Sequence, residues 1–200
     1  MKSKRGLLVV YSGPSGCGKG TVLQQVLQQR DDTVLSVSVT TRAPRPGETD
    51  GKEYFFRSRA EFDRMVAAGE LLEHAEYNGN GYGTPAAAVE QQLAAGYNVV
   101  LEIEVQGAEK VMDSGVDAVS VFLAPPSMAE LERRLHKRGT EEEPVIANRL
   151  AIARREMSRA FRYQYVIVNG ELDEAVRDLH AVLDAERLRY DRMKDYLTEE

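Results

Sequence analysis

The chain has 200 residues, a formal net charge of −6 and one cysteine, and it is 42% hydrophobic and 29% charged. This length and composition are typical of one folded domain with a sizeable core, which excludes disordered and fibrous proteins. No apolar run approaches the roughly 20 residues of a membrane span, so we expect no membrane partner. The acidic balance argues against general nucleic-acid binding. A single cysteine fits a reducing compartment, so we expect a cytoplasmic protein.

A glycine-rich segment follows the first apolar run of the chain. Residues 7–11 predict a buried strand, and residues 13–21 read Gly-Pro-Ser-Gly-Cys-Gly-Lys-Gly-Thr. Gly13, Gly18 and Lys19 have the spacing of a GxxxxGK phosphate-binding loop, in which backbone N–H groups surround a phosphate and lysine adds charge. A helix with an apolar face follows, and its N-terminus favours the same anion. The segment therefore predicts a nucleoside triphosphate site.

Two positions of this loop lead to further expectations. Residue 20 is glycine where most such loops carry a serine or threonine that holds Mg²⁺, and Thr21 is the nearest hydroxyl. We therefore predict no direct side-chain ligand for the metal, and we expect ATP and water to carry Mg²⁺ near Thr21. Cys17 lies beside Lys19 and a helix N-terminus, a setting that favours thiolate. We expect iodoacetamide to alkylate this thiol and ATP to protect it.

A stiff basic loop comes next. Apolar residues and serine alternate at residues 34–39, which is typical of a half-buried strand. Pro44 and Pro46 then keep the chain extended. Arg42 and Arg45 in this frame suit bidentate contact with a phosphate, although a solvated basic loop is the alternative. Further on we expect a strand at 54–56, a helix at 58–68 capped by Ser58, a strand at 70–77, a glycine-rich turn at 78–85 and a helix at 85–95.

Residues 98–105 form a near-continuous apolar run, which is typical of a parallel strand buried on both faces. Glu102 and Glu104 interrupt its end, and side chains two residues apart point to the same face of a strand. Ligands of open α/β sheets bind beyond the carboxyl ends of the strands. We therefore expect these acids to contact a metal or a base, with a structural salt bridge as the alternative.

Strands and helices alternate in the rest of the chain. Arg134 and Arg138 share one helical face and Arg149 lies on the next helix, although such charges are as often solvated surface. The alternation predicts an α/β fold with a parallel sheet covered by helices. The elements that we expect here are strands at 118–123 and 165–168 and helices from 127, at 141–159 and at 172–188. The segments that we expect to build the core are 4–35, 96–125 and 162–200, with insertions at 36–95 and 126–161.

The order of these motifs resembles that of bacterial guanylate kinases over essentially the whole chain. The matching positions are residues 13–21, Ser38, residues 40–46, Tyr54, Glu73, residues 82–84, residues 101–107, Arg134, Arg138, Gly139, Thr140 and Arg149. The resemblance implies a P-loop nucleoside monophosphate kinase fold, with a GMP-binding lobe at 36–95 and a lid at 126–161. It also implies the reaction ATP + GMP ⇌ ADP + GDP with Mg²⁺, in purine nucleotide metabolism and GMP recycling.

The resemblance implies roles for individual residues. The positions that match ATP-binding residues are Gly13, Pro14, Ser15, Gly16, Cys17, Gly18, Lys19, Gly20, Thr21 and Asn169. Those assigned to GMP are Ser38, Arg42, Arg45, Tyr54, Glu73, Tyr82, Thr84, Glu102 and Glu104. The expected catalytic residues are Lys19, Arg42, Arg134, Arg138 and Arg149. Glu104 stands where the family often has aspartate, which leaves open whether it contacts metal water, the guanine amine or an arginine.

Two other functions remain as alternatives. A guanylate-kinase-like module that binds phosphorylated peptides would share the arginines and tyrosines but would lack a working phosphate loop, whereas this chain has Lys19. A kinase for another nucleoside monophosphate would share the loop but would not need Glu73 together with Thr84.

Overall fold

The computed structural model describes residues 5–77, 79–137 and 142–197, and its internal contacts divide the chain into two compact units. Unit 1 comprises Met1–Val10 and Asp32–Ala118, and unit 2 comprises Tyr11–Asp31 and Val119–Glu200. The first strand, β1 (Leu8–Ser12), contributes residues to both units. Within the described residues, no helix is long and apolar enough to cross a membrane.

The first sheet of unit 1 has the strand order β2-β7-β1. β2 (Thr33–Leu35) pairs in parallel with β7 (Asn98–Glu102). Apolar side chains of β1 and β7 are almost completely buried, as the apolar runs predicted. The buried Asn98 side chain joins the strand ends, because its Oδ1 accepts from Leu7 N at 3.2 Å and its Nδ2 donates to Thr33 Oγ1 at 3.2 Å.

A second, mixed sheet of unit 1 has the order β4-β3-β6-β5. Its strands are β3 (Val39–Thr40), β4 (Phe55–Phe56), β5 (Leu71–Tyr77) and β6 (Asn80–Pro85). The helices of this unit are α2 (Arg59–Ala67), α3 (Ala86–Ala94) and α4 (Val105–Asp113). Ser58 caps α2 as predicted, because its hydroxyl accepts from Glu61 N while the Glu61 carboxylate accepts from Ser58 N, and this capping box satisfies two otherwise free donors.

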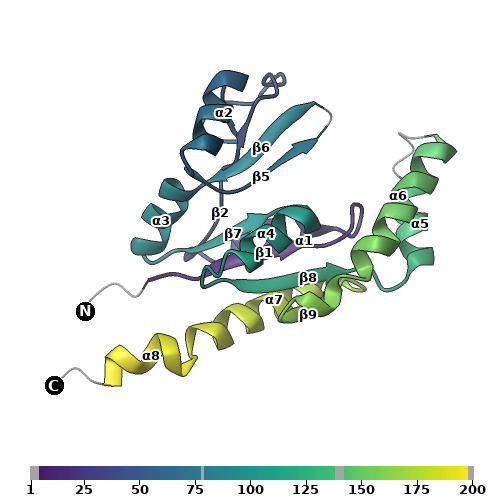
Figure 1. Cartoon of the computed structure of the whole chain (residues 1–200). Helices are drawn as coiled ribbons and strands as arrows, with labels where there is room; N and C mark the ends of the chain where they lie inside the picture. Colours follow the sequence, from purple (N-terminus) through teal and green to yellow (C-terminus); the bar gives the residue numbers. More distant parts are fainter. Residues whose placement is uncertain (1–4, 78, 138–141, 198–200) are drawn as a thin grey trace. The chain divides into compact units, whose positions relative to one another are not determined.

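Unit 2 contains the end of β1, then β8 (Val119–Ala124) and β9 (Tyr165–Val168), which pair in parallel. Its helices are α1 (Lys19–Gln29), α5 (Met128–Lys137), α6 (Glu143–Met157), α7 (Leu172–Arg187) and α8 (Tyr190–Leu197), with a 3-10 turn at Ala160–Arg162. α1 packs on α7. α5 and α6 lie side by side and share a small core of their own (Figure 1). The predicted α/β class with a helix-covered parallel sheet is confirmed.

Three predicted elements are wrong in their bounds. The strand expected at 34–39 is two strands, because β2 pairs with β7 in the first sheet while β3 pairs with β4 and β6 in the second. The turn expected at 78–85 is mostly β6, which pairs with β5 despite its glycines. The strand expected at 98–105 ends at Glu102, and α4 begins at Val105. Helices α4 and α8 were not predicted.

Candidate nucleotide-binding sites

The loop between β1 and α1 can form only because side chains are absent at two of its glycines. Gly13 has φ 152°, and a Cβ at that position would lie 2.2 Å from the carbonyl oxygen of Leu123. Gly18 has φ 98°, and a Cβ there would lie 2.4 Å from Asn169 Nδ2. Positive φ and close approach together exclude other residues without a backbone shift. The predicted GxxxxGK spacing therefore corresponds to a physical requirement of this loop.

Lys19, the first residue of α1, folds back over the loop. Its Nζ donates to the carbonyl oxygens of Gly13 at 2.6 Å and Pro14 at 3.3 Å. These contacts hold an ammonium group at the mouth of the loop and at the positive end of the helix. The arrangement suits an anion of high charge density such as a polyphosphate.

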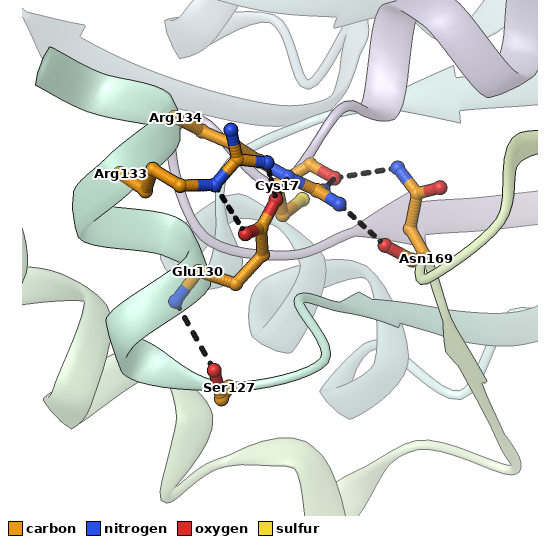
Figure 2. A network of polar contacts seen from close by, with 6 residues as sticks. All are labelled: Cys17, Ser127, Glu130, Arg133, Arg134 and Asn169. Atoms are coloured by element: carbon orange, nitrogen blue, oxygen red, sulfur yellow. Dashed lines mark hydrogen bonds and ion pairs between the residues drawn. The ribbon is translucent and has the colours of Figure 1, made fainter. Parts of the chain in front are cut away.

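The carbonyl oxygen of Cys17 joins the loop to two other elements of unit 2 (Figure 2). It accepts from Asn169 Nδ2 at 2.8 Å and from an Arg134 guanidinium nitrogen at 3.3 Å. A second guanidinium nitrogen of Arg134 donates to the Asn169 carbonyl oxygen at 2.9 Å. Arg134 on α5 and Asn169 after β9 are thus brought to the loop although they are far from it in sequence.

Glu130 orients Arg134. Its carboxylate accepts from Arg134 Nε at 2.7 Å and from two nitrogens of Arg133, each at 2.7 Å (Figure 2). Hydrogen bonds from Arg133 and then Arg134 lower the pKa of the Glu130 carboxyl to about 2. Glu130 N in turn donates to Ser127 Oγ at 3.1 Å at the start of the helix. Glu130 is a functional candidate that the sequence analysis missed, although its spacing to Arg134 was a visible signal.

A pocket of about 350 Å³ opens beside the loop. Its lining residues are Gly16, Gly18, Thr21, Arg134, Lys137, Asn169, Gly170 and Leu172. Lys137 was not predicted, yet it follows Arg134 by three residues and so shares its helical face. Arg149 is half-buried on α6. Arg138, Gly139 and Thr140 lie outside the described residues.

The burial of Cys17 contradicts the expectation that its thiol is accessible to alkylation. Its side chain is completely buried. The predicted alkylation of this thiol by iodoacetamide therefore has no support in the structure, because a reagent must reach the sulfur. The residue contributes to the loop through its backbone carbonyl.

The basic loop of unit 1 is ordered around Glu48, another residue that the sequence analysis missed. Its carboxylate accepts from one Arg42 nitrogen at 2.9 and 3.0 Å and from Arg45 N at 2.7 Å. Arg42 holds the pKa of the Glu48 carboxyl below its ordinary value. The Arg42 guanidinium also lies 5.4 Å from the ring centre of Tyr54 and 5.9 Å from that of Phe56. These contacts hold Arg42 in one orientation.

Aromatic rings line the same part of unit 1. Tyr54 and Tyr82 meet edge to face with ring centres 6.1 Å apart, and burial raises the pKa of the Tyr54 hydroxyl. Ser38 is half-buried just before β3, and its carbonyl oxygen accepts from Phe55 N at 2.8 Å. Arg45 is exposed, which leaves its side chain accessible to an anion.

Glu73 and Thr84 form a buried pair between β5 and β6. The Glu73 side chain is 7% exposed, and its Oε1 accepts from Thr84 Oγ1 at 2.7 Å. Burial raises the pKa of Glu73, and the hydrogen bond from Thr84 and the charge of Lys110 partly offset this. The single hydroxyl proton of Thr84 goes to Glu73, and Thr84 is completely buried. In this conformation Thr84 therefore supports the carboxylate.

The acids at the end of β7 do not share a strand. Glu102 ends β7 and is half-buried, whereas Glu104 is exposed and precedes α4 as its N-cap residue. The expectation that both point the same way from one strand is wrong, because the chain leaves the sheet between them. Among the described residues no group of three His, Cys, Asp or Glu side chains could hold a metal ion.

A helix-covered parallel sheet, a lysine-bearing glycine loop and an arginine-bearing helix define a P-loop protein of the nucleotide kinase class. The guanylate kinase family model matches residues 5–186, and the chain belongs to this family. It is 53% identical over 192 residues to a guanylate kinase from Desulfitobacterium hafniense, covering 96% of each chain. A guanylate kinase from Clostridium perfringens is 46% identical over 198 residues, covering 99% of this chain and 92% of the relative.

Solved structures of other proteins also match this chain. The crystal structure of guanylate kinase from Anaplasma phagocytophilum matches with a TM-score of 0.75 and 40% identity, covering 96% of this chain and 92% of that one. A shikimate kinase from Bacteroides thetaiotaomicron matches with a TM-score of 0.50 and 16% identity, and this likeness concerns the fold alone.

Proposed function

We propose that this protein transfers the terminal phosphoryl group of ATP to GMP and so forms ADP and GDP. Its family membership supports the reaction, and one observation carries the choice of acceptor. The buried Glu73 carboxylate presents a hydrogen-bond acceptor in the same chain as a complete phosphate-binding loop. Such a carboxylate can accept from the ring N–H and the exocyclic amine of guanine.

The chemistry requires positioning and charge neutralisation. The attacking group is the phosphate of GMP, which is already anionic at neutral pH and needs no general base. What the protein must supply is alignment of two anions that repel each other and stabilisation of charge on the transferred group. We assign Lys19 and the loop backbone to the ATP phosphates. To the GMP phosphate we assign Ser38, Arg42, Arg45, Tyr54 and Tyr82.

Three arginines between residues 126 and 161 complete the proposed site. Arg134 already reaches the Cys17 carbonyl of the loop, which supports a role beside the ATP phosphates. We propose Arg138 and Arg149 as further cations for the transferring group. Asn169 lines the pocket, and we assign it to the adenine side of ATP. The roles of Glu102 and Glu104 toward GMP remain proposals.

Mg²⁺ is the cofactor that we propose, held mainly by the ATP phosphates and water. The residues present fit such an ion, because Thr21 is an exposed hydroxyl at the start of α1 that lines the pocket and can offer one oxygen. Bound Mg²⁺ would neutralise charge between the phosphates. We propose the cytoplasm as the place of action, in purine nucleotide metabolism and GMP recycling, without a nucleic-acid or membrane partner.

A coupled assay with ATP and GMP, AMP, dTMP or CMP tests the proposal. We expect turnover with GMP to exceed turnover with the other acceptors at least a hundredfold. Equal turnover with AMP would contradict the assignment of Glu73 and the choice of acceptor. Absence of turnover with every acceptor, together with binding of a phosphorylated peptide, would favour the non-catalytic module.

A further inference from the structure

Helix α4 approaches β5 at the residue that we assign to guanine. A Cβ built at Gly107 would lie 3.0 Å from Glu73 Oε2 and 3.6 Å from its Cδ. Gly107 is buried in the first turn of α4, and glycine has a lower helix propensity than alanine. A glycine at such a position needs a packing reason. The close approach of the Glu73 carboxylate is such a reason.

The Glu73 carboxylate is held from two elements. Its Oε1 accepts from the completely buried Thr84 on β6, and its Oε2 faces the backbone of α4 at Gly107. Rotation away from Gly107 would break the hydrogen bond with Thr84. The space left by the missing side chain therefore sets where Oε2 can lie.

Helix α4 is itself fixed to β5. Lys110 follows Gly107 by three residues, and its Nζ donates to the carbonyl oxygen of His74 at 2.6 Å. His74 is the neighbour of Glu73 on the strand. Apolar side chains of α4 are also buried, among them Val105 and Val111. These contacts therefore oppose a movement of α4 away from Glu73.

We propose that Gly107 is a positioning residue that determines specificity for guanine. Its missing side chain leaves room for the Glu73 carboxylate, and Lys110 holds the helix that borders this space. This inference rests on the proposed role of Glu73. A methyl group at position 107 would force its neighbour to move by a few tenths of an ångström. Because α4 is held to β5 by Lys110, the Glu73 carboxylate is the group that moves. The hydrogen bonds from the base to this carboxylate then weaken.

The variant Gly107→Ala tests the proposal with GMP and IMP as acceptors. IMP keeps the ring N–H but lacks the amine, so the ratio of kcat/KM values for GMP and IMP reports the contact with the amine. We expect kcat/KM for GMP to fall about tenfold, equivalent to about 1.4 kcal/mol, mostly through KM. The preference for GMP over IMP should fall with it, while KM for ATP stays unchanged. Wild-type kcat/KM and an unchanged preference would overturn the proposal.

A double-mutant cycle separates positioning from general distortion of α4. In the Glu73→Ala background, Gly107→Ala should cause no further loss, because the group that it displaces is gone. An equal loss in both backgrounds would overturn the proposal. If Gly107→Ala does not fold, Lys110→Met decides: we expect a higher KM for GMP with an unchanged KM for ATP, and wild-type values would overturn the proposal.

Glu73→Ala alone distinguishes the two proposals. If this variant keeps the preference for GMP over AMP, the proposed role of Glu73 is wrong whatever Gly107 does. If it loses the preference while Gly107→Ala behaves as wild type, only the positioning role of Gly107 is wrong.

Discussion

At the scale of single residues, Lys19 shows how the loop prepares for an anion. Its ammonium group is bonded to two backbone carbonyls, so it is already close to the place that we assign to the ATP phosphates. A preorganised cation stabilises developing charge without the free energy needed to reorient water.

We therefore predict that Lys19→Ala lowers kcat by about a hundredfold or more and leaves the fold intact. Steady-state kinetics and circular dichroism measure both effects. Lys52→Ala is the matched control, because that side chain is 80% exposed and lies outside the proposed sites. A folded Lys19→Ala variant with near wild-type kcat would contradict the catalytic role.

Glu73 links specificity to the pH dependence of stability. Because burial raises its pKa in the folded state, the folded chain holds this proton to a higher pH than the unfolded chain. The contribution of Glu73 to stability is thus complete at acid pH and is lost as the pH rises through the folded-state pKa.

Glu73→Gln stays uncharged and should escape this loss. We predict a free energy of unfolding at pH 8 no lower than that of wild type, with the difference shrinking toward acid pH, measured by urea denaturation. The same variant should lose more than tenfold in activity with GMP and narrow the ratio of GMP to AMP activity. Glu76→Gln is the control, since its side chain lies on the same strand and is half exposed. A large loss of stability in Glu73→Gln at pH 8 would show that burial does not disfavour the ionised form of Glu73.

At the scale of elements, α5 carries both Arg134 and the acid that orients it. One turn of helix separates Glu130 from Arg134, so their contact forms with the helix itself. Glu130 is kept ionised by its two arginines over the working pH range. The orientation of Arg134 toward the loop therefore does not depend on pH near neutrality.

We predict that Glu130→Gln lowers kcat about tenfold with little change in KM for GMP, because a small misplacement of a catalytic group can cost on the order of a hundredfold. Only one of the contacts of Arg134 is weakened, so the loss should be smaller than that limit. Glu132→Gln is the matched control on an exposed position of the same helix. A normal kcat in Glu130→Gln would show that the backbone carbonyls of Cys17 and Asn169 are enough to orient Arg134.

Elements were predicted correctly from the sequence where one local pattern marked them. The prediction was wrong where an apolar run or a glycine pattern extended over more than one kind of element. Ser58 predicted the start of α2, and the GxxxxGK spacing predicted the phosphate loop. The apolar run at 98–105 continued across the junction of β7 and α4, and periodicity cannot locate a boundary inside such a run. In β6, glycines suggested a turn, but pairing with β5 overrides that preference.

The candidate sites show the same contrast. Residues with a local motif, such as Lys19, could be found from the sequence. Glu48 and Glu130 were missed, and Gly107 was matched only within residues 101–107 with no role assigned, because the importance of these residues comes from what they contact after folding. Gly107 is the clearest example, since its neighbour Glu73 is distant in sequence and on a different element.

At the scale of the whole molecule, the residues that we assign to the two nucleotides belong to different compact units. Lys19 and Arg134 lie in unit 2, whereas Arg42 and Glu73 lie in unit 1. Phosphoryl transfer requires reacting atoms at about 3 to 3.5 Å, so both nucleotides must be held in one geometry during the reaction. Binding both at once should therefore restrict the positions that segments 36–95 and 126–161, which we propose as the GMP-binding lobe and the lid, can take.

We predict that an analogue joining adenosine and guanosine through a chain of phosphates lowers the radius of gyration measured by small-angle X-ray scattering. The analogue offers both bases and the phosphates at once, so its binding energy can hold the closed form. ATP alone and GMP alone are the controls, and each should cause a smaller change, because each contacts only one set of cations. An analogue with two adenosines should also close the molecule less, because adenine has an acceptor at N1 and no amine at C2, so Glu73 cannot accept the pair of hydrogen bonds that guanine offers. An equal radius for the free and the analogue-bound protein would contradict closure of the lobe and the lid.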